Sequence, residues 1–326
     1  MLYVGSTLGL CASPGRGATP SGEENIALGE RLSSAGDARW AIANAAPSGF
    51  TIRRDVAEVR LHFSVADERG KLLDSVSGDE LRILDNRRPV EQLRNLSRTS
   101  DLPLQIGVLL DVSDSMQKTV FREKQAAQYF FAHVFRPETD RSFLLAFGND
   151  VKVWQSSTAD RESLTRALGK VSQAGFATYL YDSIFSACLE DFHAANDGTM
   201  AQRILVLFSD GDDTGSLHTR SEAIALAQRR EVQIYAVTVH SPRLAAPGDN
   251  ILRSLADATG GQFSAAHTDK DIPALFGAME RQMRAQFAVS FRPSEWTAGY
   301  HTLQVQVSGA QTVRVRARQG YYFDAP

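Results

Sequence analysis

Acidic and hydroxyl side chains alternate directly after a buried apolar run. Residues 111–115 read Asp-Val-Ser-Asp-Ser, so Asp111, Ser113 and Ser115 occupy every second position. One carboxylate and two hydroxyl groups offer a small all-oxygen site, which suits a hard divalent cation such as Mg²⁺. The alternative is that an Asp or Ser before a helix serves only as an N-cap. The spacing by itself leaves both interpretations open.

The surrounding segments favour a binding site. Residues 106–110 are continuously apolar, as expected of a central strand of a parallel sheet buried on both faces. A second apolar run at 204–208 ends in the acidic segment 209–213, and a glycine-led loop at 175–182 lies between the two runs and opens into a helix. Because ligands of open α/β sheets bind outside the carboxyl ends of the strands, these loops are expected to form one site.

With these segments in this order, the chain resembles the von Willebrand factor A (VWA) family. The family's metal-ion-dependent adhesion site (MIDAS) takes D-x-S-x-S from the first strand's loop, a threonine from a middle loop and an aspartate after the fourth strand. The resemblance assigns these metal-ligating roles to Asp111, Ser113, Ser115, Thr178 and Asp210. It implies Mg²⁺, or alternatively Mn²⁺ or Ca²⁺, with one coordination position open to a carboxylate of a partner protein.

The chain departs from the family pattern at Asp114, where glycine is usual. Asp tolerates strained backbone conformations better than most residues, so the loop is still expected to form. The extra charge, with Asp212 and Asp213, leaves the identity of the metal and the charge of the partner open. We interpret these three acids as solvated loop residues, with metal ligation as the alternative.

The distribution of strand and helix patterns predicts an α/β domain with β-structure on either side. Strands and helices alternate over 99–284, which predicts a doubly wound, mostly parallel, Rossmann-like sheet, with an antiparallel edge at 141–154. The flanks 49–98 and 285–326 alternate with period two, and neither has enough strands for a stable sheet. We therefore predict that together they form a small immunoglobulin-like sandwich into which the VWA domain is inserted. Residues 1–48 are expected to be a disordered leader or a degraded signal.

The composition of the chain argues against several classes of protein and function. A net charge of −3 over 326 residues gives no reason to expect nucleic acid, and Cys11 and Cys188 are too few for a disulfide framework. No apolar stretch approaches the roughly 18 residues that span a bilayer, so no transmembrane segment is expected. The alternating residues Arg314, Arg316 and Arg318 suggest either an anion site or a solvated strand face, and we favour the solvated face.

The leading hypothesis is a non-enzymatic, adhesion-like module that engages an acidic side chain of a partner protein through the metal. A structural domain with a non-functional metal site is the alternative. A metal-dependent hydrolase is disfavoured because G-x-x-x-x-G-K-[ST] and G-x-S-x-G motifs are absent and no histidine is expected near these loops to act as a base. The similarity extends over about residues 50–323 to VWA-related proteins of Acidobacteria, which implies a bacterial protein that is secreted or in the cell envelope, although no clear signal peptide is present.

Overall fold

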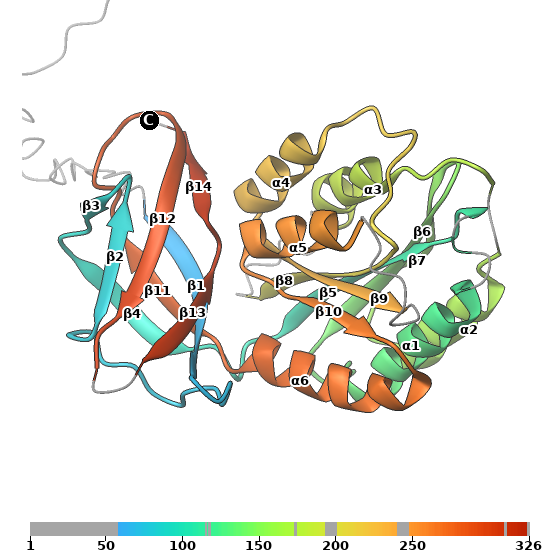
Figure 1. Cartoon of the computed structure of the whole chain (residues 1–326), viewed down its shortest axis with the longest axis horizontal. Coiled ribbons are helices and arrows are strands. Elements are labelled where there is room, and N and C mark those ends of the chain that lie inside the picture. Colours follow the sequence, from blue (N-terminus) through green and yellow to red (C-terminus); the bar gives the residue numbers. More distant parts are fainter. Residues whose placement is uncertain are drawn as a thin grey trace, which may run out of the picture. The chain divides into compact units, whose positions relative to one another are not determined.

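Three β-sheets and six α-helices form the described part of the chain (Figure 1). The computed structural model describes residues 58–114, 116, 119–172, 175–192, 201–239, 248–309 and 312–324. The predicted leader and the candidate ligand Ser115 lie outside these ranges. Over the same ranges, no helix combines the length and apolarity needed to cross a membrane.

The largest sheet has six strands, and its order confirms the predicted α/β fold. Along the sheet these are β10 (Phe263–Ala266), β9 (Val232–Val239), β8 (Gln202–Phe208), β5 (Leu104–Asp111), β6 (Arg141–Phe147) and β7 (Val151–Thr158). All neighbours pair in parallel except β6 and β7, which form the antiparallel edge. The two strands that carry the candidate acidic loops, β5 and β8, are therefore direct neighbours.

Helices cover both faces of this sheet (Figure 1). On one face lie α1 (Val120–His133), α2 (Arg161–Lys170) and α6 (Ile272–Arg284); on the other lie α3 (Leu180–Ser186), α4 (Arg220–Arg229) and α5 (Gly248–Thr259). A short π-helix at Ala187–Asp191 follows α3. A turn of 3₁₀-helix at Asp269–Asp271 precedes α6. Because side chains of a strand alternate between faces, Val108 and Leu110 pack under α1 and Leu109 packs on the opposite side. The apolar run of β5 is thus buried on both faces.

Two four-stranded antiparallel sheets are built from the flanking segments. One has the order β13 (Val313–Ala317), β1 (Val59–Asp67), β11 (Phe287–Phe291), β4 (Leu93–Arg98); the other has β14 (Gly320–Phe323), β12 (Gly299–Val307), β2 (Leu81–Asp85), β3 (Arg88–Pro89). Strand β1 lies between two strands from the far end of the chain, and side chains of both sheets share one apolar core. The immunoglobulin-like topology and the exact domain boundaries stay predictions.

The arginines of β13 and the residue after it make specific contacts, so our solvated-face interpretation is wrong for two of the three. Arg316 donates to the carboxylate of Asp257 and to the carbonyl of Gly261, 3.2 and 2.8 Å away. The guanidinium of Arg318 is buried and donates to the carbonyl of Gln228, 3.1 Å away. Because a guanidinium group has five donors, Arg318 takes a carbonyl partner on α4, and Arg316 takes a carboxylate of α5 and a carbonyl just after that helix.

A buried polar network connects the two flanks. The Oδ1 atom of Asp85 lies 2.9 Å from Nδ1 of His301, and Nε2 of the same ring lies 2.8 Å from the carbonyl oxygen of Thr297. Tyr321 donates its hydroxyl to Oδ2 of Asp85 at 3.2 Å. Since Asp85 comes from the first flank and its partners from the second, the network holds β2 against β12 and β14.

We predict that Asp85→Ala lowers the free energy of unfolding by about 3–5 kcal/mol, because it leaves a buried histidine without its carboxylate partner. The matched control is Glu295→Ala, which removes an ion pair that also joins the flanks, between the exposed Arg88 and the partly exposed Glu295. Loss of an exposed pair costs less than about 1 kcal/mol. Urea unfolding measures both; equal losses in the two variants would contradict a joint module held by the buried network.

Candidate functional site

Asp111 is the last residue of β5, and its carboxylate is fully buried. Oδ1 accepts hydrogen bonds from the backbone N–H and the hydroxyl of Ser113, at 3.0 and 2.6 Å. Oδ2 accepts a third from the hydroxyl of Ser209, at 2.8 Å. Because β5 is paired on both sides, with Asp111 opposite Phe147 and Leu110 opposite Phe208, this carboxylate is held at a defined position at the sheet's edge.

Ser209 contributes to the site although the sequence analysis did not select it. Its hydroxyl donates to Asp111 and accepts from the backbone N–H of Gly211 at 3.0 Å. Gly211 has φ of +86°, and a Cβ there would lie 2.3 Å from the carbonyl oxygen of Gly248, so the turn requires glycine. In the sequence, Ser209 lies directly after the apolar run of β8 and beside Asp210, and this position could have indicated that it belongs to the site.

Asp210 lies in the same turn and is partly exposed. Its Oδ1 accepts the backbone N–H of Asp212 at 3.1 Å, an Asx-type turn that orients the carboxylate. Its negative charge acts on the carboxyl groups of Asp111 and Glu123. The structure therefore brings the two sequence-predicted acids, Asp111 and Asp210, into one electrostatic environment.

The loop that carries Thr178 is hydrogen-bonded to both acidic loops. The backbone N–H of Asp114 donates to the carbonyl of Gly175 at 3.0 Å. The carbonyl of Thr178 accepts from the N–H groups of Thr214 and Gly215, at 3.0 and 3.1 Å, and its own N–H donates to the hydroxyl of Thr214 at 2.9 Å. Thr178 is buried, so its loop, the Asp111 loop and the Asp210 loop form one connected assembly.

The three acids that we interpreted as solvated loop residues behave differently from one another. Asp212 is exposed and Asp114 is partly buried. Asp213 instead accepts the backbone N–H of Leu180 at 2.9 Å and the hydroxyl of Ser216 at 2.5 Å. It thereby satisfies a free donor at the N-terminus of α3, so the interpretation is wrong for Asp213, which is a capping residue supplied by another loop.

Burial dominates the electrostatics of the site. It raises the pKa of Asp111 to about 6, against the opposing effect of hydrogen bonds from Ser113 and Ser209, and the charge of Asp210 adds to the rise. On α1, burial foremost and then the charges of Asp111 and Asp210 raise the pKa of Glu123 well above its usual value. The site thus gathers acidic groups, two of them where burial disfavours the charged form, and the sequence did not indicate that Glu123 would be one of these.

The donor set fits a hard cation. Within the described ranges, no three His, Cys, Asp or Glu side chains gather closely enough to hold a metal by themselves. A cation would therefore depend on hydroxyl oxygens in addition to the two carboxylates, and Ser113 and Thr178 supply such groups on the connected loops. Oxygen ligands of this kind suit Mg²⁺, Mn²⁺ or Ca²⁺. Ser115, the remaining candidate, lies outside the described residues.

A family model agrees with the α/β architecture, and several solved structures show a limited likeness to the chain. A sequence profile of the von Willebrand factor type A domain matches residues 105–278. BatB, a conserved hypothetical protein from Bacteroides thetaiotaomicron, is 15% identical with a TM-score of 0.46, over 56% of this chain and 99% of that one. An aerotolerance-related membrane protein from Bacteroides fragilis is 16% identical with a TM-score of 0.43, over 55% and 99%.

Proximal thread matrix protein 1 from the mussel byssus, solved with a zinc-occupied MIDAS motif, is 15% identical with a TM-score of 0.48. That match covers 60% of this chain and 48% of the mussel chain, so this chain spans about half the length of the mussel protein. No curated protein matches the sequence.

We predict that Ser209→Ala lowers the free energy of unfolding by about 1–3 kcal/mol, because it leaves a buried carboxylate oxygen and a buried N–H without partners. The matched control is Ser221→Ala, an exposed serine at the start of α4, for which the change should stay within about 0.5 kcal/mol. Denaturant unfolding of both variants measures the difference. If Ser209→Ala were as stable as the control, the hydroxyl would not hold Asp111 in place.

Proposed function

We propose, since the chain belongs to the von Willebrand factor type A domain family, that it is a non-enzymatic module that binds a partner protein through a divalent cation. The resemblance to this family implies a protein–protein interaction through the metal. The proposed metal ligands are Asp111, Ser113, Ser115, Thr178 and Asp210. The observation that carries the proposal is the buried carboxylate of Asp111, held by Ser113 and Ser209 within the connected loops.

The chemistry of these ligands explains how recognition would work. Hydroxyl groups are neutral, so a cation held by them and two carboxylates keeps much of its positive charge. Mg²⁺ favours octahedral coordination at about 2.1 Å and keeps several waters, one of which a partner's carboxylate can replace. We therefore propose that an acidic side chain of the partner completes the coordination.

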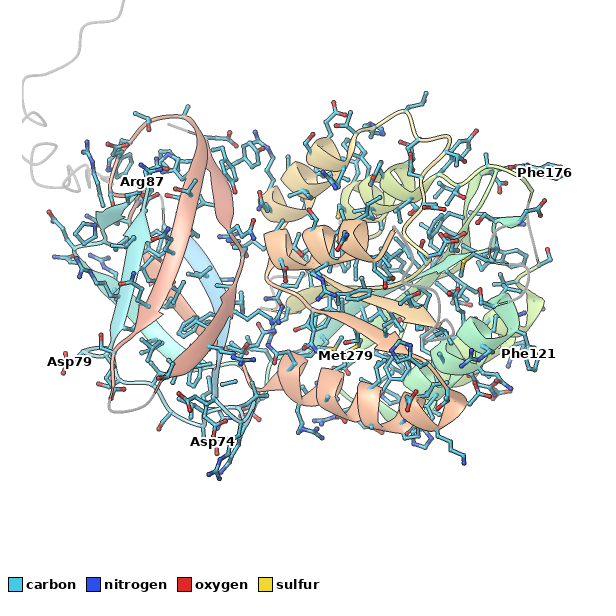
Figure 2. The ribbon with its side chains drawn as sticks, viewed as in Figure 1. Asp74, Asp79, Arg87, Phe121, Phe176 and Met279 are labelled. Atoms are coloured by element: carbon cyan, nitrogen blue, oxygen red, sulfur yellow. The ribbon has the colours of Figure 1, made fainter. Side chains whose placement is uncertain are left out.

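Exposed apolar side chains near the proposed site support a protein partner. Phe176, two residues before Thr178, is 89% exposed, and Leu217, in the loop after Asp210, is 92% exposed. Phe121 on α1 is 67% exposed. Phe121 and Phe176 both project on the side of the molecule at which the parallel strands end (Figures 1 and 2). A protein with apolar surface around an acidic residue would match this face.

A hydrolytic function gains no support from the histidine closest in sequence to these loops. That residue is His218, eight residues after Asp210. Its Nδ1 atom is 2.7 Å from Oδ1 of Asp182, and its ring stacks on Phe185 at 3.7 Å between centroids. These contacts assign His218 to fixing the loop between β8 and α4.

We propose a location outside the cytoplasm, secreted or in the cell envelope, as the family resemblance implies.

The test of the proposed function is metal binding followed by partner capture. Calorimetry should show binding of about one Mg²⁺ or Mn²⁺ per chain, which Asp210→Ala should abolish without unfolding the protein, because this residue lies in a partly exposed turn. The control is Asp79→Ala, an acid in an exposed turn of the antiparallel part, which should bind metal as the unchanged protein does (Figure 2). Unchanged affinity in Asp210→Ala would refute the ligand assignment.

The same preparations then serve to capture the partner from native cell extract in Mg²⁺ and in EDTA. We expect capture to require the metal, and Thr178→Ala to weaken partner binding strongly while weakening metal binding only modestly. Threonine is a neutral ligand, so its loss removes less attraction for the cation than loss of a carboxylate does. Partner binding that was indifferent to EDTA would place recognition elsewhere on the molecule.

We also predict that the affinity for Mg²⁺ falls as the pH drops below about 6. The pKa of Asp111 is raised to about 6 by burial, so a proton occupies this carboxylate increasingly as the pH drops through that value. A cation must displace that proton, which costs up to about tenfold in apparent affinity per pH unit. Calorimetry with Mg²⁺ from pH 5 to 8 measures this; an affinity that stayed constant between pH 5 and 7 would contradict it.

A further inference from the structure

Glu123 occupies a position on α1 where an apolar residue is expected. The buried residues of this helix are Glu123, Ala126, Ala127, Phe130 and Phe131, spaced as one face of a helix that packs on the sheet. All except Glu123 are apolar, yet its side chain is also fully buried. An acid in such a position is costly unless something compensates its charge.

No described residue provides that compensation. Neither Oε1 nor Oε2 of Glu123 has a hydrogen-bond partner among the residues that the structure describes. The charges that act on its carboxyl group are those of Asp111 and Asp210, and both are negative. Glu123, in the first turn of α1, and Asp111, at the carboxyl end of β5, are therefore both buried, and the partly exposed Asp210 acts on both of them. A cation at the proposed metal site would attract all three.

Glu123, Asp111 and Asp210 do not gather closely enough to bind one ion together. No three acidic, histidine or cysteine side chains within the described ranges lie close enough to bind one ion together. Carboxylates just outside a coordination sphere accept hydrogen bonds from bound waters or ligands, and Mg²⁺ in particular keeps waters that need such acceptors. The two unpartnered oxygens of Glu123 have the chemistry for this role.

We propose that Glu123 is a positioning residue of the metal site, whose carboxylate accepts hydrogen bonds from waters bound to the cation. The inference rests on the proposed function and extends it. Its negative charge, added to those of Asp111 and Asp210, lets the site hold the cation before a partner arrives. Recognition then begins from a metal-loaded module, and the partner's carboxylate exchanges with a water that Glu123 orients.

The test is Glu123→Gln, which removes the charge and keeps the size of the side chain. Mg²⁺ affinity measured by calorimetry should fall about 10- to 100-fold, the usual effect of losing an outer partner of a metal site. The melting temperature in EDTA should rise, because the cost of burying an ionisable acid without a partner is gone, whereas the increase in melting temperature on adding Mg²⁺ should shrink. A residue that only packs in the core would lower both stabilities together.

The matched control is Asp212→Asn, which removes an exposed negative charge beside Asp210. Because solvent and salt screen exposed charges, its Mg²⁺ affinity should stay within about twofold of the unchanged protein. Glu123→Met, an unbranched apolar replacement, provides a second variant should glutamine disturb folding, and it should show the same opposite changes in stability.

The outcomes separate this inference from the proposed function. If the unchanged protein bound no divalent cation, both would be wrong. If it bound Mg²⁺ and Glu123→Gln bound it equally well, only the role of Glu123 would be overturned, and the proposed function would stand. If Asp212→Asn lost as much affinity as Glu123→Gln, the effect would be a general one of charge, and the positioning role would also be overturned.

Discussion

The carboxylate of Asp111 is buried at the end of the central strand, and the surrounding loops depend on this constraint. A buried charge requires hydrogen-bond partners, and these come from Ser113 in its own loop and from Ser209 at the end of β8. Ser209 in turn fixes the N–H of Gly211, and Thr178 joins the assembly through Thr214. The parallel pairing of β5 and β8 is what brings these groups together.

Burial of carboxyl groups, with repulsion between them as a second cause, dominates the electrostatics of the site. Burial raises the free energy of the ionised carboxylates of Asp111 and Glu123, and the charge of Asp210 adds to this cost at both. Hydrogen bonds from serine hydroxyls relieve part of this cost at Asp111 but do not reach Glu123. A divalent cation would convert the repulsion into attraction, so metal binding and stability should be closely coupled in this protein.

Buried polar contacts connect the α/β part with the antiparallel sheets. At the end of α6, Arg284 forms an ion pair with Asp140, which also accepts the N–H of Leu104 at the start of β5. Two residues later, Gln286 donates to the side chains of Gln233 and Tyr235 on β9, and β11 begins at the next position. The chain therefore passes from the sheet that carries the site into the antiparallel part without a free linker.

Local pattern in the sequence determined the features that depend on near neighbours along the chain. The apolar run 106–110 predicted a doubly buried strand, the alternation around Val59 and Phe63 predicted a half-buried one, and the D-x-S-x-S spacing selected Asp111 and Ser113 for the candidate site. Tertiary structure alone decided the rest. Ser209 reaches Asp111 because β8 lies beside β5, Asp213 caps α3 from another loop, and Glu123 is buried because α1 packs that face on the sheet. These contacts join residues far apart in sequence, and their energies depend on burial, which no short sequence pattern specifies.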